Sequence, residues 1–231
     1  MARQQKEQNE ENQSGSDAAT TAGDGRQERN TSERLRFLES LEKIDLAISG
    51  VTDHDEMISR ACLSLLEILD CDRVSLLYPC NPEVDRARVE HEITKPGLET
   101  GNEGKTIPLL PEHLAMFRQM LATDKALLYG PGGDFELPEE AFAFLSMQSQ
   151  IVMVLRPLAG DPWFFSIHQC DRPRRWSEKE RRLVQEVGRR IADSLSILLI
   201  LNDVRSSEAR YRTLFERAAD AILVHDGAAF S

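Results

Sequence analysis

Apolar residues recur every three or four positions in two stretches near the N-terminus, which predicts two helices. The first helix is expected from about Ser32 to Gly50, with Leu35, Leu38, Leu41, Ile44 and Ile48 on one face. The second is expected to be capped by Thr52. Its wider apolar face holds Met57, Ile58, Ala61, Cys62, Leu65, Leu66 and Leu69. A face this wide is typical of a helix that packs against a sheet, so Cys62 is predicted to be a core residue.

After residue 72 the apolar pattern is that of β-strands. Residues 73–80 (RVSLLYPC) form a predicted buried strand, and residues 87–94 (ARVEHEIT) alternate as its hairpin partner. Residues 150–158 (QIVMVLRPL) and 163–170 (WFFSIHQC) form a second pair around a turn. Between the two pairs, the sequence predicts a loop, helices that begin at Pro111 and Pro138, and a short strand (KALLYG).

A long helix is predicted to begin at Ser177, which forms a capping box with Glu180. No helix breaker follows until about Ala218, so this helix outruns any single domain face. Its far end is therefore expected to pack against a second copy of the chain. The predicted dimer interface is Val184, Val187, Ile191, Leu195, Leu198 and Leu201. The alternative is that this stripe packs entirely on the protein's own sheet.

The order of elements predicts an α+β fold, with a central, largely antiparallel sheet of five to six strands between helices. Long helices are expected at both of its ends. Residues 1–31 contain no Leu, Ile, Val, Phe, Tyr or Trp. Because such a segment has nothing to bury, it is predicted to be a disordered tail.

Charge and cysteine usage narrow the classes of partner. The net charge of −11 argues against binding to nucleic acid or to an anionic membrane. The four cysteines form no CxxC pair, so no metal site is predicted. The N-terminus lacks the features of a signal peptide, and no apolar run reaches membrane-spanning length. We therefore expect a cytoplasmic protein without direct membrane contact.

Two segments resemble the GAF family of sensory domains. Residues 163–195 (WFFSIHQCDRPRRWSEKERRLVQEVGRRIADSL) are similar to the last strand and last helix of GAF domains in bacterial sensor kinases and phytochrome-like photoreceptors. Residues 55–78 (DEMISRACLSLLEILDCDRVSLLY) resemble the first helix and strand of the family. The resemblance covers residues 53–200. It implies a GAF-like fold and a role in signal transduction.

Residues 207–226 (SEARYRTLFERAADAILVHD) resemble the start of a PAS domain, in which a helix leads into a strand, here Ala221 to Val224. The two resemblances together imply a tail (1–31), an N-terminal signalling helix (32–52), a GAF domain (53–200), a helical linker (201–213) and a truncated PAS start (214–231). Families with this layout usually end in a histidine kinase or a diguanylate cyclase of a two-component system.

The sequence contains no pattern of a catalytic site. A Walker loop, a GxSxG motif and an HExxH motif are all absent, and the five histidines are scattered, so enzymatic activity is not expected. The resemblance implies that covalent bilin attachment needs a cysteine in the middle of the domain, but none lies between Cys80 and Cys170. We therefore expect no cofactor and in particular no covalent bilin. A noncovalent tetrapyrrole or haem at His113 or His168 remains open.

The resemblance places a ligand on one face of the sheet, beneath the middle helices. The pattern assigns to this pocket Tyr78, Phe142, Met153, Trp163, Phe165 and His168. Two functions remain open. One is a sensor that relays the state of a small-molecule ligand through a helical homodimer to a downstream domain. The other is a ligand-free dimerisation and spacer module.

Overall fold

The computed structural model describes residues 27, 30–98, 101–138 and 146–225. The chain divides into two compact units, Met1–Lys43 and Ile44–Ser231. A helix covers residues 30–48, close to the predicted bounds. The expected tail at residues 1–31 and the expected helix at Pro138, which falls on residues 139–145, lie almost entirely outside the described residues. The second unit carries the sheet and all the elements discussed below.

The described residues form one six-stranded sheet in the order β3-β2-β1-β6-β5-β4. Every neighbouring pair of strands is antiparallel, as the sequence predicts. The strands are β1 (Arg73–Tyr78), β2 (Arg86–Thr94), β3 (Thr106–Pro108), β4 (Leu127–Tyr129), β5 (Ser149–Leu155) and β6 (Trp163–Gln169). Of these, β3 was not predicted. It is three residues long and pairs only with the start of β2.

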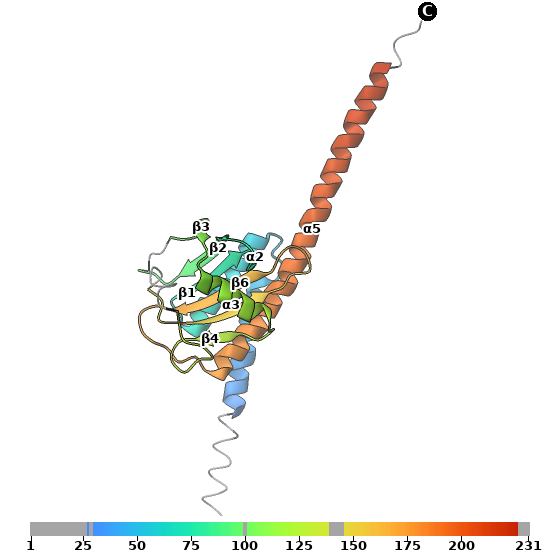
Figure 1. Cartoon of the computed structure of the whole chain (residues 1–231). Coiled ribbons are helices and arrows are strands. Elements are labelled where there is room, and N and C mark those ends of the chain that lie inside the picture. The colour runs from blue at the N-terminus through green and yellow to red at the C-terminus, as the bar shows by residue number, and fades with distance from the viewer. Residues whose placement is uncertain (1–26, 28–29, 99–100, 139–145, 226–231) are drawn as a thin grey trace, which may run out of the picture. The chain divides into compact units, whose positions relative to one another are not determined.

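Helices cover both faces of the sheet (Figure 1). One face packs against α2 (His54–Leu69) and α5 (Glu178–His225), and the other against α3 (Pro111–Leu121). The predicted apolar face of α2 is confirmed, because all seven of its residues are buried. Its N-cap is Asp53 rather than Thr52, and the Asp53 side chain accepts a hydrogen bond from the backbone N–H of Glu56 at 2.9 Å.

The first part of α5 packs on the protein's own sheet. Val184, Val187, Ile191 and Leu195 are fully buried within this single chain. At Gly188 the helix approaches β5 so closely that a Cβ would overlap the sulfur of Met153. These four residues therefore belong to the core, as the alternative reading of the stripe held. Of the six residues in the predicted interface, only Leu198, which is half-buried, and Leu201, which is exposed, leave apolar surface for another chain.

The capping box at the start of α5 is confirmed, since Ser177 N–H donates to Glu180 Oε2 at 2.7 Å and Glu180 N–H to Ser177 Oγ at 3.3 Å. The helix then continues to His225. The strand expected at Ala221–Val224 is therefore wrong. Each residue that extends an existing helix gains a backbone hydrogen bond within the helix. A strand that has no sheet to join would leave its backbone N–H and C=O groups unpaired. No helix among the described residues is long and apolar enough to cross a membrane.

Arg174 joins the end of β6 to two helices. Its guanidinium donates hydrogen bonds to the carbonyls of Leu69 (2.7 Å) and Asp70 (3.0 Å), at the end of α2. It also donates to Gln169 Oε1 (2.9 Å) and to Glu180 Oε1 (2.6 Å), and it lies 4.1 Å from the ring centre of Trp176. Arg174 lies in residues 163–195, one of the two segments that resemble GAF domains, and its role here is to hold the strand and the helices together.

Candidate functional site

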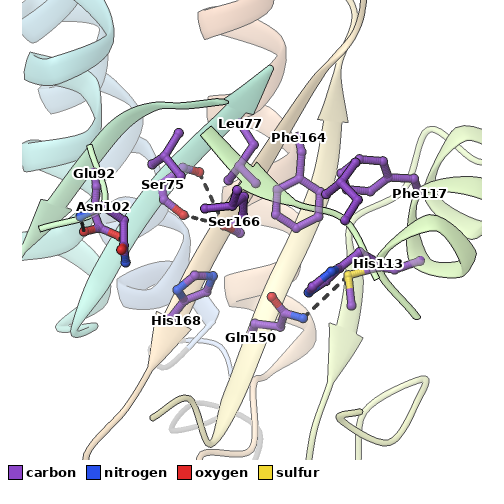
Figure 2. A pocket seen from close by; sticks show the side chains of 14 residues that line it. Ser75, Leu77, Glu92, Asn102, His113, Phe117, Gln150, Phe164, Ser166 and His168 are labelled. Atoms are coloured by element: carbon purple, nitrogen blue, oxygen red, sulfur yellow. Dashed lines mark hydrogen bonds between the residues drawn. The ribbon is translucent and has the colours of Figure 1, made fainter. Parts of the chain in front are cut away.

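A cavity of about 40 Å³ lies between α3 and the face of the sheet opposite α2. Figure 2 shows its lining, which combines apolar and polar side chains from β1, β2, β5, β6 and α3. The lining residues are Ser75, Leu77, Val89, Glu92, Asn102, Ile107, Leu109, His113, Met116, Phe117, Gln150, Phe164, Ser166 and His168. A few polar groups between apolar walls are typical of a small-molecule site.

The floor of the cavity is polar because alternate residues of the two central strands are polar there. Ser75 of β1 pairs with Ser166 of β6, and their hydroxyl oxygens lie 2.9 Å apart. Beside them Arg73 pairs with His168. Both strands lie in the middle of the sheet, so all four side chains are buried, and those of Ser75, Ser166 and His168 line the cavity (Figure 2). The floor therefore offers hydrogen-bonding groups in a dry environment, where each such bond is strong.

His168 is a neutral hydrogen-bonding group rather than a cation. Burial and the neighbouring guanidinium of Arg73 both hold the pKa of its ring well below the usual range. Arg73 Nη1 lies 3.4 Å from Nδ1 of His168. Because a guanidinium only donates, Nδ1 accepts in this contact and the proton of the neutral ring lies on Nε2. His168 can therefore donate one hydrogen bond through Nε2.

Among the polar residues that line the cavity, Gln150 is the one with a buried side-chain atom that lacks a hydrogen-bond partner among the described residues. Its side chain is fully buried at the cavity wall, and its Nε2 lies 3.7 Å from the sulfur of Met116, a weak acceptor. Its Oε1 has no hydrogen-bond partner among the described residues. Turning the amide over exchanges the two atoms but leaves one of them unpaired. A buried polar group in this state costs about 1–3 kcal/mol, which a bound molecule with an N–H or O–H group would offset.

The two ends of the cavity differ in character (Figure 2). At one end Glu92 accepts hydrogen bonds from Asn102, at 3.0 Å from its backbone N–H and at 3.5 Å from its side-chain amide. At the other end the rings of Phe117 and Phe164 lie 5.3 Å apart with their planes inclined by 40°. The cavity thus has an acidic end and an aromatic end.

A β-bulge brings Glu92 to the cavity. The register between β1 and β2 shifts between Leu76 and Leu77, which pair with His91 and Val89 and leave Glu90 without a partner. As a result, Val89 and Glu92 both reach the cavity, although simple alternation would place them on opposite faces.

Of the predicted pocket residues, the structure brings His168 to the cavity. Tyr78, Met153, Trp163 and Phe165 are not among its lining residues. Met153 and Phe165 alternate with the lining residues and point toward α2 and α5, and Trp163 packs on Tyr78 with ring centres 5.0 Å apart. Phe142 lies outside the described residues. The sequence pattern did not assign most of the polar lining residues to the pocket, above all Ser75, Ser166, Gln150 and Glu92.

Comparison with known proteins gives a fold but no sequence relative. No family model matches the chain, and no curated protein matches it. Solved structures do match. The far-red-absorbing dark state of JSC1_58120g3 with bound biliverdin IXa has a TM-score of 0.58 at 14% identity, over 69% of this chain and 98% of that one.

Two further matches are GAF domains. The phycoerythrobilin-bound GAF domain from a cyanobacterial phytochrome has a TM-score of 0.57 at 16% identity, over 73% of this chain and 99% of the other. The blue-light-absorbing GAF domain of PixJ from Thermosynechococcus elongatus has a TM-score of 0.53 at 18% identity, over 67% and 92%. The chain therefore has a GAF-like α+β fold, as predicted.

The comparisons correct the expectation about cofactors. The sequence argument predicted no cofactor and disfavoured a covalent bilin, but two of these similar structures hold bilins. The argument rested on the absence of a cysteine between Cys80 and Cys170. The structure places Cys80 in one apolar cluster with Met116, Phe117 and Phe164, all three of which line the cavity. A cysteine outside the middle of the sequence therefore lies in the same apolar cluster as residues that line the cavity.

Proposed function

We propose that this chain is the sensory module of a signalling protein and that the cavity beside α3 is its ligand site. In this proposal the ligand is a bilin or a similar conjugated molecule that carries N–H groups. The observation that carries the proposal is Gln150, a fully buried amide at the cavity wall with an oxygen that no described residue satisfies. The bilins in two structures of the same fold supply the ligand class.

The chemistry of the lining residues suits such a ligand. Gln150 Oε1 and the carboxylate of Glu92 would accept hydrogen bonds from N–H groups, and the imidazole of His168 would donate one to a carbonyl. Phe117 and Phe164 would pack on the conjugated faces. A bilin, when bound, would supply the absorption of visible light. The cavity walls would hold it in one conformation and exclude water.

The cavity must widen for a ligand of this size. Drug-sized molecules occupy pockets of about 300–1,000 Å³, whereas this cavity measures about 40 Å³. The side of the cavity formed by α3 is suited to repacking, because Met116 and Met120 are unbranched side chains with several rotatable bonds. We therefore propose that ligand binding displaces α3 from the sheet and so changes the fold around it.

Replacing Gln150 by Leu is expected to weaken bilin binding at least about tenfold and to raise the free energy of unfolding by about 1 kcal/mol. The ligand loses an acceptor, while the unliganded protein loses a buried unpaired group. Biliverdin is titrated into each protein and followed by its visible absorption band, and stability is measured by urea denaturation. Gln148→Leu is the matched control, because Gln148 is exposed and absent from the cavity lining.

The two readouts separate the possible outcomes. Equal biliverdin affinity in the wild type and in Gln150→Leu would contradict the assignment of this amide to the ligand site. A wild-type protein that leaves the spectrum of biliverdin unchanged would contradict the bilin class. The chain would then act as the dimerisation and spacer module that is the other reading of its sequence.

The signal is proposed to leave the domain through α5, in a homodimer. An exposed apolar stripe runs along this helix beyond the sheet, and we call Ile197, Leu201, Val204, Tyr211 and Phe215 the distal stripe. Its spacings of four, three, seven and four residues follow the heptad of a two-stranded coiled coil, with Glu208 at the remaining seam position. Identical seams are self-complementary, so the occupant proposed for this stripe is a second copy of α5.

The proposed role is regulatory rather than catalytic. The described cysteines are buried, and burial raises the pKa of Cys71 and of Cys80 to about 12, so neither is a ready nucleophile. Ligand binding would instead favour one of two packings of the dimer, and the altered α5 would act on a downstream output domain. The sequence resemblance suggests a kinase or a cyclase for that output.

A further inference from the structure

A carboxylate, that of Glu208, interrupts the distal stripe of α5. Glu208 follows Val204 by four residues and precedes Tyr211 by three, so it lies on the same face of the helix as the apolar residues of the stripe. In the notation of the heptad, Val204 and Tyr211 hold d positions, and the a positions are held by Leu201, Glu208 and Phe215. A charged side chain therefore lies in the predicted seam between apolar neighbours.

Glu208 forms an ion pair with Arg212, one turn further along the same helix. Nη2 of Arg212 lies 3.1 Å from Glu208 Oε1, and the two side chains are 70% and 68% exposed in the single chain. An exposed pair of this spacing contributes little to an isolated helix. Arg212 holds an e position, which flanks the seam of a coiled coil. The pair is therefore expected to matter only where a second helix covers the seam.

The way in which two α5 helices pair decides what Glu208 faces. In a parallel pair in register, a positions face a positions, so the two Glu208 side chains meet at one level, each beside the Arg212 of its own chain. The four charges sum to zero. In an antiparallel pair, a positions face d positions, and all d positions of the stripe are apolar. In a parallel pair shifted by one heptad, Glu208 faces Leu201 or Phe215. Both of these alternatives remove a carboxylate from water against an apolar side chain, which is costly.

From this contrast we propose that Glu208, together with Arg212, selects the parallel, in-register pairing of two α5 helices. The inference rests on the dimer of the proposed function and adds which of several pairings the chain adopts. A single polar residue at an a position specifies register in coiled coils, at a cost in stability. Parallel pairing brings the C-terminal ends of the two helices side by side, as relay to a pair of downstream domains requires.

Replacing Glu208 by Leu is expected to tighten the dimer and to abolish the preference for one pairing. Two leucines then fill the seam in place of two carboxylates, so the dimer dissociation constant falls at least about tenfold. Sedimentation velocity measures that constant. The pairing is measured by double electron–electron resonance between nitroxide labels on a cysteine introduced by Glu178→Cys, at the start of α5. Labelling is selective because all four native cysteines are buried.

The label distance separates parallel from antiparallel pairing. Parallel helices in register hold both labels at one level of the dimer, which gives a single short distance. Antiparallel helices that pair along the distal stripe separate the labels by about 80 Å, because an α-helix rises 1.5 Å per residue. The wild type is expected to show the short distance alone, and Glu208→Leu to show additional, longer distances. The matched control is Glu216→Leu, which adds the same apolar side chain at an exposed position outside the distal stripe. It is expected to keep the wild-type affinity and distance.

The outcomes distinguish this inference from the dimer on which it rests. A wild-type monomer would overturn both. A wild-type dimer with labels about 80 Å apart would overturn the parallel pairing and leave the dimer standing. A Glu208→Leu dimer with the wild-type affinity and the same single distance would show that Glu208 selects nothing.

Discussion

Replacing both Leu201 and Val204 by Glu is expected to convert a wild-type dimer into a monomer. The two side chains are 44% and 57% exposed in the single chain, so charges there leave the core of the domain intact. Each buried Leu or Val contributes about 1.5–3 kcal/mol. The loss over two positions in each of two chains therefore exceeds about 4 kcal/mol, and the dimer dissociation constant rises at least about a thousandfold.

The measurement is sedimentation velocity over a range of protein concentrations, with circular dichroism to verify folding. Asn202→Glu is the matched control, because it adds the same charge at an exposed position of α5 outside the distal stripe. It is expected to remain a dimer. A double variant that stays dimeric would exclude the distal stripe as the interface, and a wild-type monomer at high concentration would contradict relay through α5.

Replacing Arg174 by Ala is expected to lower the free energy of unfolding by about 3 kcal/mol. The substitution removes the donor for two carbonyls at the end of α2, for Gln169 and for Glu180. Its side chain is 20% exposed, so water replaces part of the lost bonding, but groups left unpaired in the partly buried network cost more. Because the side chain is partly exposed, the expected loss of stability lies at the lower end of the range for breaking a buried ion pair.

Arg172→Ala is the natural comparison for this effect. Arg172 lies two residues away, is 63% exposed and forms an ion pair with its neighbour Asp171. A surface pair of this kind contributes little, so the expected change is within about 0.5 kcal/mol. Both variants are measured by urea denaturation at neutral pH. Equal stability of the two would show that the guanidinium of Arg174 does not hold β6 to the helices.

The elements of this fold could be predicted because their periodicities are strong. The apolar face of α2, the antiparallel pairing of β5 with β6 and the capping box at Ser177 all follow from local sequence, and all are confirmed. The short strand β3 could not be predicted, because three residues at the edge of a sheet carry no periodic signal. Its pairing with β2 depends on tertiary contacts alone.

The cavity was harder to predict for two physical reasons. Aromatic residues were chosen for the pocket, but on β6 the aromatics Trp163 and Phe165 alternate with Ser166 and His168 and so face the other side. Grouping residues by alternation before weighing their chemistry would have joined Ser166 to His168. The position of Glu92 could not be predicted even in this way, because the alternating pattern of the sequence does not show the bulge that turns Glu92 toward the cavity.

The dimer stripe shows a different limit. From Val184 to Leu201 the sequence displays one continuous apolar periodicity, and periodicity does not tell which neighbour covers a face. The sheet covers it as far as Leu195. Beyond that residue the helix leaves the domain, and the exposed positions follow the heptad of the distal stripe instead (Figure 1).

Native mass spectrometry of the wild-type chain, incubated with biliverdin and freed from excess pigment, tests the central claim most directly. The proposal predicts a dimer whose mass includes one biliverdin per chain, together with an absorption band that differs from that of the free pigment. A protein of bare chain mass, with all the pigment recovered unbound and its spectrum unchanged, would contradict a bilin-binding sensor.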